Sequence, residues 1–133
     1  MNQDLAALVG YRIGQANDAL RAADALLNEG LWRDSVNRSY YAMFYAVLAL
    51  LALKGTGTSK HTGAIAMFDK DYVKAGLFSK ELSQTLHRTF EMRLEADYDE
   101  VSTVSEQDAQ LVVSQAREFV GKLSEHLRQQ TSL

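Results

Sequence analysis

The chain has 133 residues, of which 47% are hydrophobic and 23% are charged, a balance that fits one globular domain over residues 1–133. It has no cysteine, which excludes disulfides, thiolate metal sites and a cysteine nucleophile and is typical of a reducing, cytoplasmic compartment. Its net charge of −3 excludes an overall positive field that would attract nucleic acid or an anionic membrane.

The first predicted element is an amphipathic helix from about Asp4 to Glu29, ended by Gly30. The opening residues lack the basic stretch and apolar run of a signal peptide, so we expect no secretion. With no proline and many good helix formers, the whole chain is predicted to be all-α. The apolar residues of this first helix recur at spacings of three and four, as one buried stripe requires: Leu5, Val9, Ile13, Ala16, Leu20, Ala23 and Leu27.

The second predicted helix, from about Trp32 to Lys54, is apolar on most of its sides. Its uncharged run from Ser39 to Leu53 would span roughly 22 Å, short of a ~30 Å bilayer core, so we expect a buried helix. Such a helix is either central to a bundle or shared with a subunit interface. We therefore predict a homodimer, with this helix contributing Tyr41, Tyr45 and Leu48 to the interface.

Three further helices are predicted after a loop at KGTGTSKHTG. The first runs from about Lys60 to Ala75, and the next is capped by Ser79 and carries apolar residues every four positions. The last begins near Thr103 to Ser105, where TVSE resembles a capping box.

Few residues of the chain have the type and spacing of catalytic, metal-binding or phosphate-binding groups. The three histidines have no ligand-like spacing to one another, and the pair Glu91 and Glu95 is more typical of a solvated helix face, so no metal site and no cofactor are predicted. The loop before Lys60 and His61 has glycines and hydroxyls ahead of a helix N-terminus, which can attract phosphate, but it lacks the P-loop order. An exposed connection between helices is the alternative.

The segment RLEADYD, residues 93 to 99, has two interpretations. Arg93 and Asp97 lie four residues apart, which fits an ion pair on an exposed helix face. Tyr98 continues the apolar stripe of the fourth helix, with its ring expected at the edge of the core. Structure alone would account for the segment.

Four segments together resemble the HEPN domain family, in the small stand-alone branch often encoded beside minimal nucleotidyltransferases: RSYYAMFYAVLALLALKG, SKHTGAIAMFDKDYVKAG, RLEADYD and AREFV. The likeness covers about residues 10 to 123. It implies a four- to five-helix up-and-down bundle that dimerises. It also implies a two-gene toxin–antitoxin module, in which a nucleotidyltransferase partner is the antitoxin, and a metal-independent ribonuclease activity in many members.

The resemblance identifies candidate catalytic residues. Family ribonucleases use an arginine followed, after a short variable spacer, by a histidine. Arg93 matches the arginine, but Tyr98, Asp99 and Glu100 occupy the positions of the histidine, and no other arginine precedes a histidine at that spacing. The candidates are therefore Arg93, Asp97 and Tyr98, and Tyr98 is also a candidate acceptor of adenylyl groups from the partner enzyme.

Candidate contacts to a nucleotide or RNA are Asn37 and Arg38, at the start of the aromatic helix, and Lys60 and His61, in the loop. For Asn37 and Arg38 the alternative is a solvated first turn. The predicted function is a dimeric binding module that associates with a nucleotidyltransferase, its catalytic histidine replaced. The alternative is an active endoribonuclease toxin that uses Arg93.

Overall fold

The computed structural model describes residues 3–58, 60–98 and 103–131, with side chains at all these positions except 97 and 98. Over these ranges it contains five α-helices and one short π-helix, η1, and no strand. The elements are α1 (Gln3–Asn28), α2 (Trp32–Leu53), α3 (His61–Phe68), η1 (Asp69–Val73), α4 (Lys80–Tyr98) and α5 (Glu106–Thr131). The predicted all-α class is confirmed.

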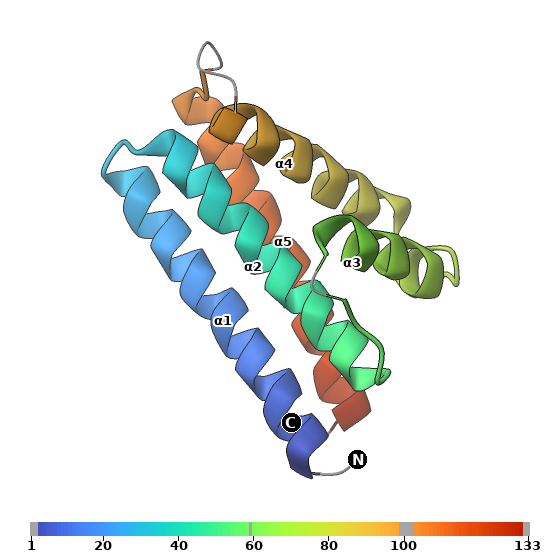
Figure 1. Ribbon diagram of the computed structural model, residues 1–133. Helices are drawn as coiled ribbons and strands as arrows, with labels where there is room; N and C mark the ends of the chain where they lie inside the picture. The colour runs from blue at the N-terminus through green and yellow to red at the C-terminus, as the bar shows by residue number, and fades with distance from the viewer. Residues whose placement is uncertain (1–2, 59, 99–102, 132–133) are drawn as a thin grey trace.

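The long helices α1, α2 and α5 lie side by side, and α3 and α4 cover the remaining side of α2 (Figure 1). Helix α1 begins and α5 ends at the same end of this up-and-down bundle (Figure 1). Helix α2 packs against α1, α3, α4 and α5, so the prediction of a central second helix is confirmed.

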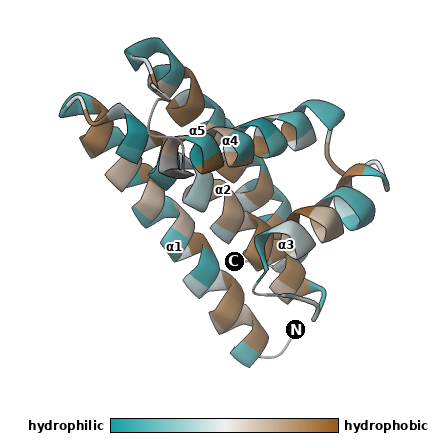
Figure 2. Ribbon diagram, turned by 45° about the horizontal axis from the view of Figure 1, so that its top comes forward, coloured by the Kyte–Doolittle hydropathy of each residue, from teal (hydrophilic) through white to brown (hydrophobic). Residues whose placement is uncertain are grey.

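Helix α2 supplies the middle of the hydrophobic core, and its exposed surface is small. Figure 2 shows apolar and polar residues alternating along the helices, as helices with one buried side require. By length and composition α2 could cross a membrane, but 67% of its most apolar window is buried inside the bundle. Its apolar character is therefore that of a core helix.

Helices α1 and α2 approach closely because small residues face each other. Ala16, Ala19 and Ala23 of the first helix are buried against the second. The Ser35 hydroxyl of α2 donates a hydrogen bond to the Ala23 carbonyl oxygen at 2.8 Å, which satisfies a buried polar group between the two helices. Gly30, at a φ of 76°, forms the left-handed turn that reverses the chain between them.

Two helix starts test the predicted caps. The Ser79 hydroxyl accepts the Leu82 backbone N–H at 3.2 Å, which confirms the predicted cap of α4. The predicted TVSE box is wrong by two residues. Ser105 Oγ accepts the Asp108 N–H at 3.0 Å, and Asp108 Oδ2 accepts the Ser105 N–H at 3.3 Å, so the box joins Ser105 to Asp108.

The third predicted helix does not run as one α-helix. After Phe68 the backbone widens into η1, in which the Lys74 N–H donates to the Asp69 carbonyl five residues earlier, at 2.7 Å. Two tertiary contacts accompany the wider turn. The buried Tyr72 hydroxyl donates to the Leu50 carbonyl of α2 at 2.9 Å, and Asp69 contacts α4 through Ser83 and His87.

Candidate functional site

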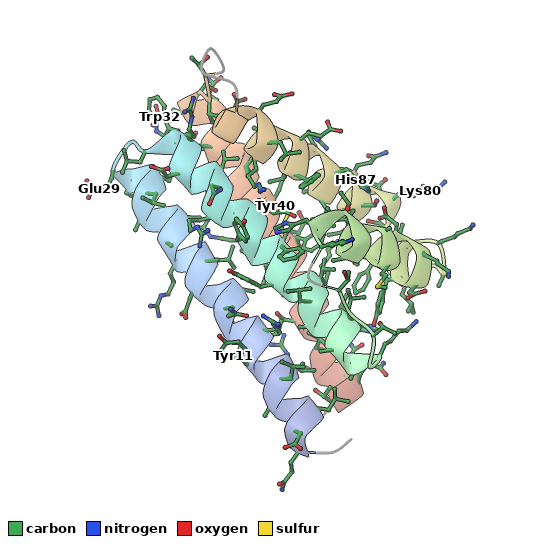
Figure 3. The ribbon with its side chains drawn as sticks, in the orientation of Figure 1. Tyr11, Glu29, Trp32, Tyr40, Lys80 and His87 are labelled. Carbon is green, nitrogen blue, oxygen red and sulfur yellow. The ribbon has the colours of Figure 1, made fainter. Side chains whose placement is uncertain are left out.

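Tyr40, fully buried near the middle of α2, is the centre of a cluster of aromatic and basic side chains (Figure 3). Its hydroxyl is hydrogen-bonded to Nδ1 of His61, the first residue of α3, at 2.7 Å. The His61 ring lies parallel to the Phe44 ring, with centroids 4.1 Å apart and planes 1° from parallel. These two contacts fix both the position and the tilt of the imidazole.

Arg93 of α4 contacts the ring of the same tyrosine. Its guanidinium carbon lies 5.2 Å from the Tyr40 ring centroid, 5.6 Å from that of Tyr41 and 5.8 Å from that of Phe90. Only 9% of the residue is exposed. The predicted exposed position is therefore wrong for Arg93, because three aromatic rings from two helices surround the guanidinium, while the predicted pairing with Asp97 involves a side chain outside the described residues.

Burial and the Arg93 charge set the protonation of the cluster. Burial raises the pKa of the Tyr40 hydroxyl above its ordinary range, so the phenol keeps its proton. Burial lowers the pKa of His61 below its usual 6.5, and the positive charge of Arg93 lowers that pKa further. The imidazole is therefore neutral at neutral pH, and a neutral imidazole can accept a proton.

The loop before α3 positions His61 through a close packing contact at Gly63. A Cβ at this glycine would lie 2.9 Å from Cγ2 of Thr58, closer than side chains approach one another. The Thr58 hydroxyl also accepts the Lys60 backbone N–H at 3.2 Å. The loop thus lies directly on the first turn of α3. His61 is part of the cluster, whereas Lys60 is exposed.

Asn37 and Arg38 are partly buried, neither fully exposed nor part of the core. Arg38 donates from Nε and a terminal nitrogen to Asn37 Oδ1, at 3.3 and 3.1 Å. Its guanidinium carbon lies 4.7 Å from the centroid of the Tyr41 ring. Tyr41 is therefore in contact with Arg38 and with Arg93, and it joins the predicted binding pair to the predicted catalytic arginine.

A hollow of about 680 Å³ lies beside this cluster, between α1, α2 and the loop after α2. All three predicted interface residues, Tyr41, Tyr45 and Leu48, line it and are partly buried. Leu8 of α1 also lines it, and 42% of that residue is exposed. The hollow has an apolar floor with an open polar edge formed by Arg12 and Gln15, whose side chains are hydrogen-bonded at 3.0 Å.

Comparison of the sequence with known protein families gives a match along most of the chain. A family model described as the HEPN domain matches residues 9–127. The chain belongs to the HEPN domain family. The resemblance noted from four short segments is thereby confirmed, over a range close to the one predicted from the sequence.

Relatives of this HEPN chain cover most of its length. A "UPF0332 protein" of Thermotoga maritima is 37% identical over 124 residues, which are 91% of this chain and 94% of the relative. "Putative toxin MJ0605" of Methanocaldococcus jannaschii is 30% identical over 129 residues, 97% of this chain and 96% of the relative. "Putative toxin MJ0142" of the same organism is 31% identical over 115 residues, 86% and 78% of the two chains.

The HEPN fold brings together residues that were predicted separately. Arg93, predicted as catalytic, and His61, predicted as a loop contact to phosphate, both contact Tyr40. The side chains of Asp97 and Tyr98 lie outside the described residues. From the sequence, Tyr40, Phe44 and Phe90 are expected only as apolar residues of the second and fourth predicted helices, and their spacing gives no signal that they form a site. Among the described residues, no three His, Asp or Glu side chains are grouped to hold a metal ion.

Proposed function

We propose that this HEPN protein is the toxin of a two-gene module and that it cleaves RNA with Arg93 and His61. The observation that carries the proposal is the Tyr40 bridge, which contacts the imidazole through its hydroxyl and the guanidinium through its ring. The chain lacks a histidine at the family spacing after Arg93, and His61 supplies an imidazole from another helix. The names of two relatives as toxins agree with this proposal.

The chemistry requires a proton acceptor and a cation beside one phosphodiester. The ribose 2′-hydroxyl attacks phosphorus, the 2′-oxygen to phosphorus bond forms, and the bond to the 5′-oxygen breaks. Neutral His61 accepts the proton of the 2′-hydroxyl, and its protonated form returns one to the leaving 5′-oxygen. Arg93 stabilises the extra negative charge on the phosphoryl oxygens, within a site of low dielectric where such stabilisation is strong.

Tyr40 is a positioning residue in this mechanism. Because its phenol keeps its proton, the hydroxyl can donate to Nδ1 or accept from an Nδ1–H. When Nδ1 carries the proton, Nε2 has the free lone pair that a base needs. The pair can therefore hold the imidazole in one orientation through both halves of the reaction.

The proposal includes a homodimer and a minimal nucleotidyltransferase partner. Support for the dimer comes from the hollow lined by Tyr41, Tyr45 and Leu48, together with the exposed Leu8 and Tyr11 on α1. Apolar side chains of this size around one concave surface are typical of a covered interface. A second copy there would lie beside Tyr41 and therefore beside both arginines that contact its ring. Adenylylation of Tyr98 by the partner stays a prediction.

A test uses matched single variants of the purified protein on a fluorescent RNA. His61→Gln should reduce the cleavage rate by about 10²- to 10⁴-fold, as loss of a general acid–base group does. Arg93→Lys keeps the charge and should still lose most activity, because it removes the planar fork. His126→Gln is the control, since His126 of α5 contacts Tyr72 and Phe78 and lies outside the cluster.

A non-catalytic binding module is the second candidate, favoured by one observation: Arg93 is only 9% exposed and is surrounded by rings. Under this function the cluster would be structural, and the protein would act by binding its nucleotidyltransferase partner. Folded His61→Gln that matches wild type in RNA cleavage and in growth arrest, while still copurifying with the partner, would replace the first function with the second.

A further inference from the structure

A second basic surface lies between η1 and the start of α4, and we call it the lysine groove. It is a hollow of about 610 Å³ whose lining is Ala66, Asp69, Lys70, Val73, Lys74, Lys80 and Ser83. Lys80 and His87 mark the α4 side of this region in Figure 3. Three of its seven lining residues are lysines, in a chain whose net charge is −3.

The groove has one carboxylate, and that carboxylate is already engaged. Asp69 Oδ1 accepts the Ser83 hydroxyl hydrogen at 2.6 Å, and Asp69 Oδ2 is hydrogen-bonded to His87 Nε2 at 2.6 Å. Among the described residues none of the three groove lysines forms an ion pair within 4.0 Å. Glu81, the nearest acid on α4, lines a different hollow. Asp71 of η1 does not line the groove either, so the lining carries three ammonium groups against one carboxylate.

The position of Lys80 also favours a binding role for the groove. It is the first residue of α4, where the helix dipole disfavours a cation by about 0.3–1 kcal/mol. An exposed residue that lowers helix stability does not serve the fold, and such local exceptions are expected at functional sites. Lys70 and Lys74 stand four residues apart beside the widened turn of η1, so both ammonium groups can reach the same side of the groove.

The lysine groove is aligned with the Arg93 cluster. Asp69, just after α3, contacts Ser83 and His87, while His61, at the start of α3, lies near Phe90, with ring centroids 6.5 Å apart. The segment from α3 to η1 therefore runs antiparallel to α4. Ser83 of the groove precedes Phe90 of the cluster by seven residues, about two turns, so both lie on the same side of α4 with a rise of about 10 Å between them, and one extended strand can contact both places.

We propose that the lysine groove binds the phosphodiester backbone of the RNA strand on one side of the bond to be cleaved. This inference rests on the proposed ribonuclease function and deepens it by assigning a place for the substrate strand. Lysine ammonium groups are point charges on flexible stems, which suit backbone phosphates without selecting a sequence. The lining has no aromatic residue for base stacking or for anchoring a protein partner, which favours a backbone contact over an acidic peptide.

The test compares two triple variants with the same change in charge. Lys70→Gln/Lys74→Gln/Lys80→Gln removes the groove cations, and Arg21→Gln/Lys122→Gln/Arg128→Gln removes three exposed cations of α1 and α5. All six side chains are exposed, so circular dichroism should show both variants folded. The probes are a 2′-O-methyl RNA of about ten nucleotides, which spans the groove and the cluster, and a dinucleotide, which cannot.

Binding is measured by fluorescence anisotropy over a range of salt concentrations. For a single strand each phosphate contact contributes about 0.7 to the slope of log K against log salt, so the groove variant should lose about 2 from the slope. The surface variant should keep the wild-type slope, and both should bind the dinucleotide as wild type does. With unmodified RNA, the groove variant should lose kcat/KM on the long substrate and keep it on the dinucleotide.

The outcomes separate the two proposals. An unchanged slope in the groove variant, with wild-type cleavage intact, overturns the groove assignment and leaves the ribonuclease function standing. A lysine-dependent slope without cleavage of either substrate supports the groove and refutes the ribonuclease. A third outcome is that the wild-type protein binds polyglutamate, the groove variant does not, and both bind RNA equally well. The groove is then a peptide site and the inference is wrong.

Discussion

Removing the Tyr40 hydroxyl tests whether this side chain holds the cluster together. Tyr40→Phe keeps the ring that contacts Arg93, Phe44 and Phe90 and deletes only the 2.7 Å hydrogen bond to His61. A buried hydrogen bond contributes about 1 kcal/mol, with a range of about 0.5–1.5 kcal/mol. His61 is only partly buried and can be rehydrated, so we expect the loss to lie within that range.

The expected change in melting temperature follows from the length of the chain. Unfolding entropy is about 2.1 cal/mol/K per residue, which for 133 residues is about 0.28 kcal/mol/K. A loss of about 1 kcal/mol therefore lowers the Tm by about 4 °C. Thermal unfolding followed by circular dichroism at fixed pH measures it directly.

Tyr45→Phe is the matched control, because it deletes a tyrosine hydroxyl from the same helix at the edge of the hollow. We expect its Tm to stay within about 1 °C of wild type, because among the described residues the Tyr45 hydroxyl forms no hydrogen bond that the change would remove. The reasoning about Tyr40 is refuted if the two variants melt together, or if the His61 ring signals in an NMR spectrum of Tyr40→Phe keep their wild-type chemical shifts and pH dependence.

Three further outcomes follow from the same structure. The pKa of His61 in the folded chain is below 6.5, so the unfolded chain gains this proton first as the pH falls. The free energy of unfolding of the wild type should therefore fall as the pH drops through 6.5. In urea titrations, His61→Gln should flatten this dependence. Leu86→Ala, at a fully buried position, should cost about 2–5 kcal/mol in the same assay, and a smaller loss would contradict the packing. Gly63→Ala should lower RNA cleavage by displacing the loop from α3, and Gly63→Ala/Thr58→Ser, which removes the methyl group it meets, should restore activity. Failure of the double variant to recover would show that the contact does not position His61.

The helices and their buried sides could be predicted from the sequence because they follow from local periodicity. Helix α2 is apolar on most sides, and this alone gives its central place in the bundle. The cap at Ser79 is equally local, whereas the box before α5 was ambiguous: Thr103 with Glu106 and Ser105 with Asp108 have the same spacing. Only the observed hydrogen bonds distinguish the two registers.

The candidate site could not be assembled from the sequence because its members come from three helices. Arginine is normally exposed, and nothing local to Arg93 indicates that rings of α2 cover it. His61 and Arg93 are thirty-two residues apart, so a spacing rule along the chain misses the pair. The π-turn of η1 is similar, since it accompanies contacts of Asp69 and Tyr72 with distant helices.

Tyr41 belongs to two surfaces at once. Its ring contacts Arg38 and Arg93, and the same residue lines the hollow beside α1. A molecule that occupies the hollow and changes the orientation of this ring changes the surroundings of both cations. By thermodynamic linkage the effect is reciprocal: a phosphate held by the arginines alters the affinity of the hollow for its occupant by the same factor. Under the proposed function, this one side chain would couple assembly to substrate binding.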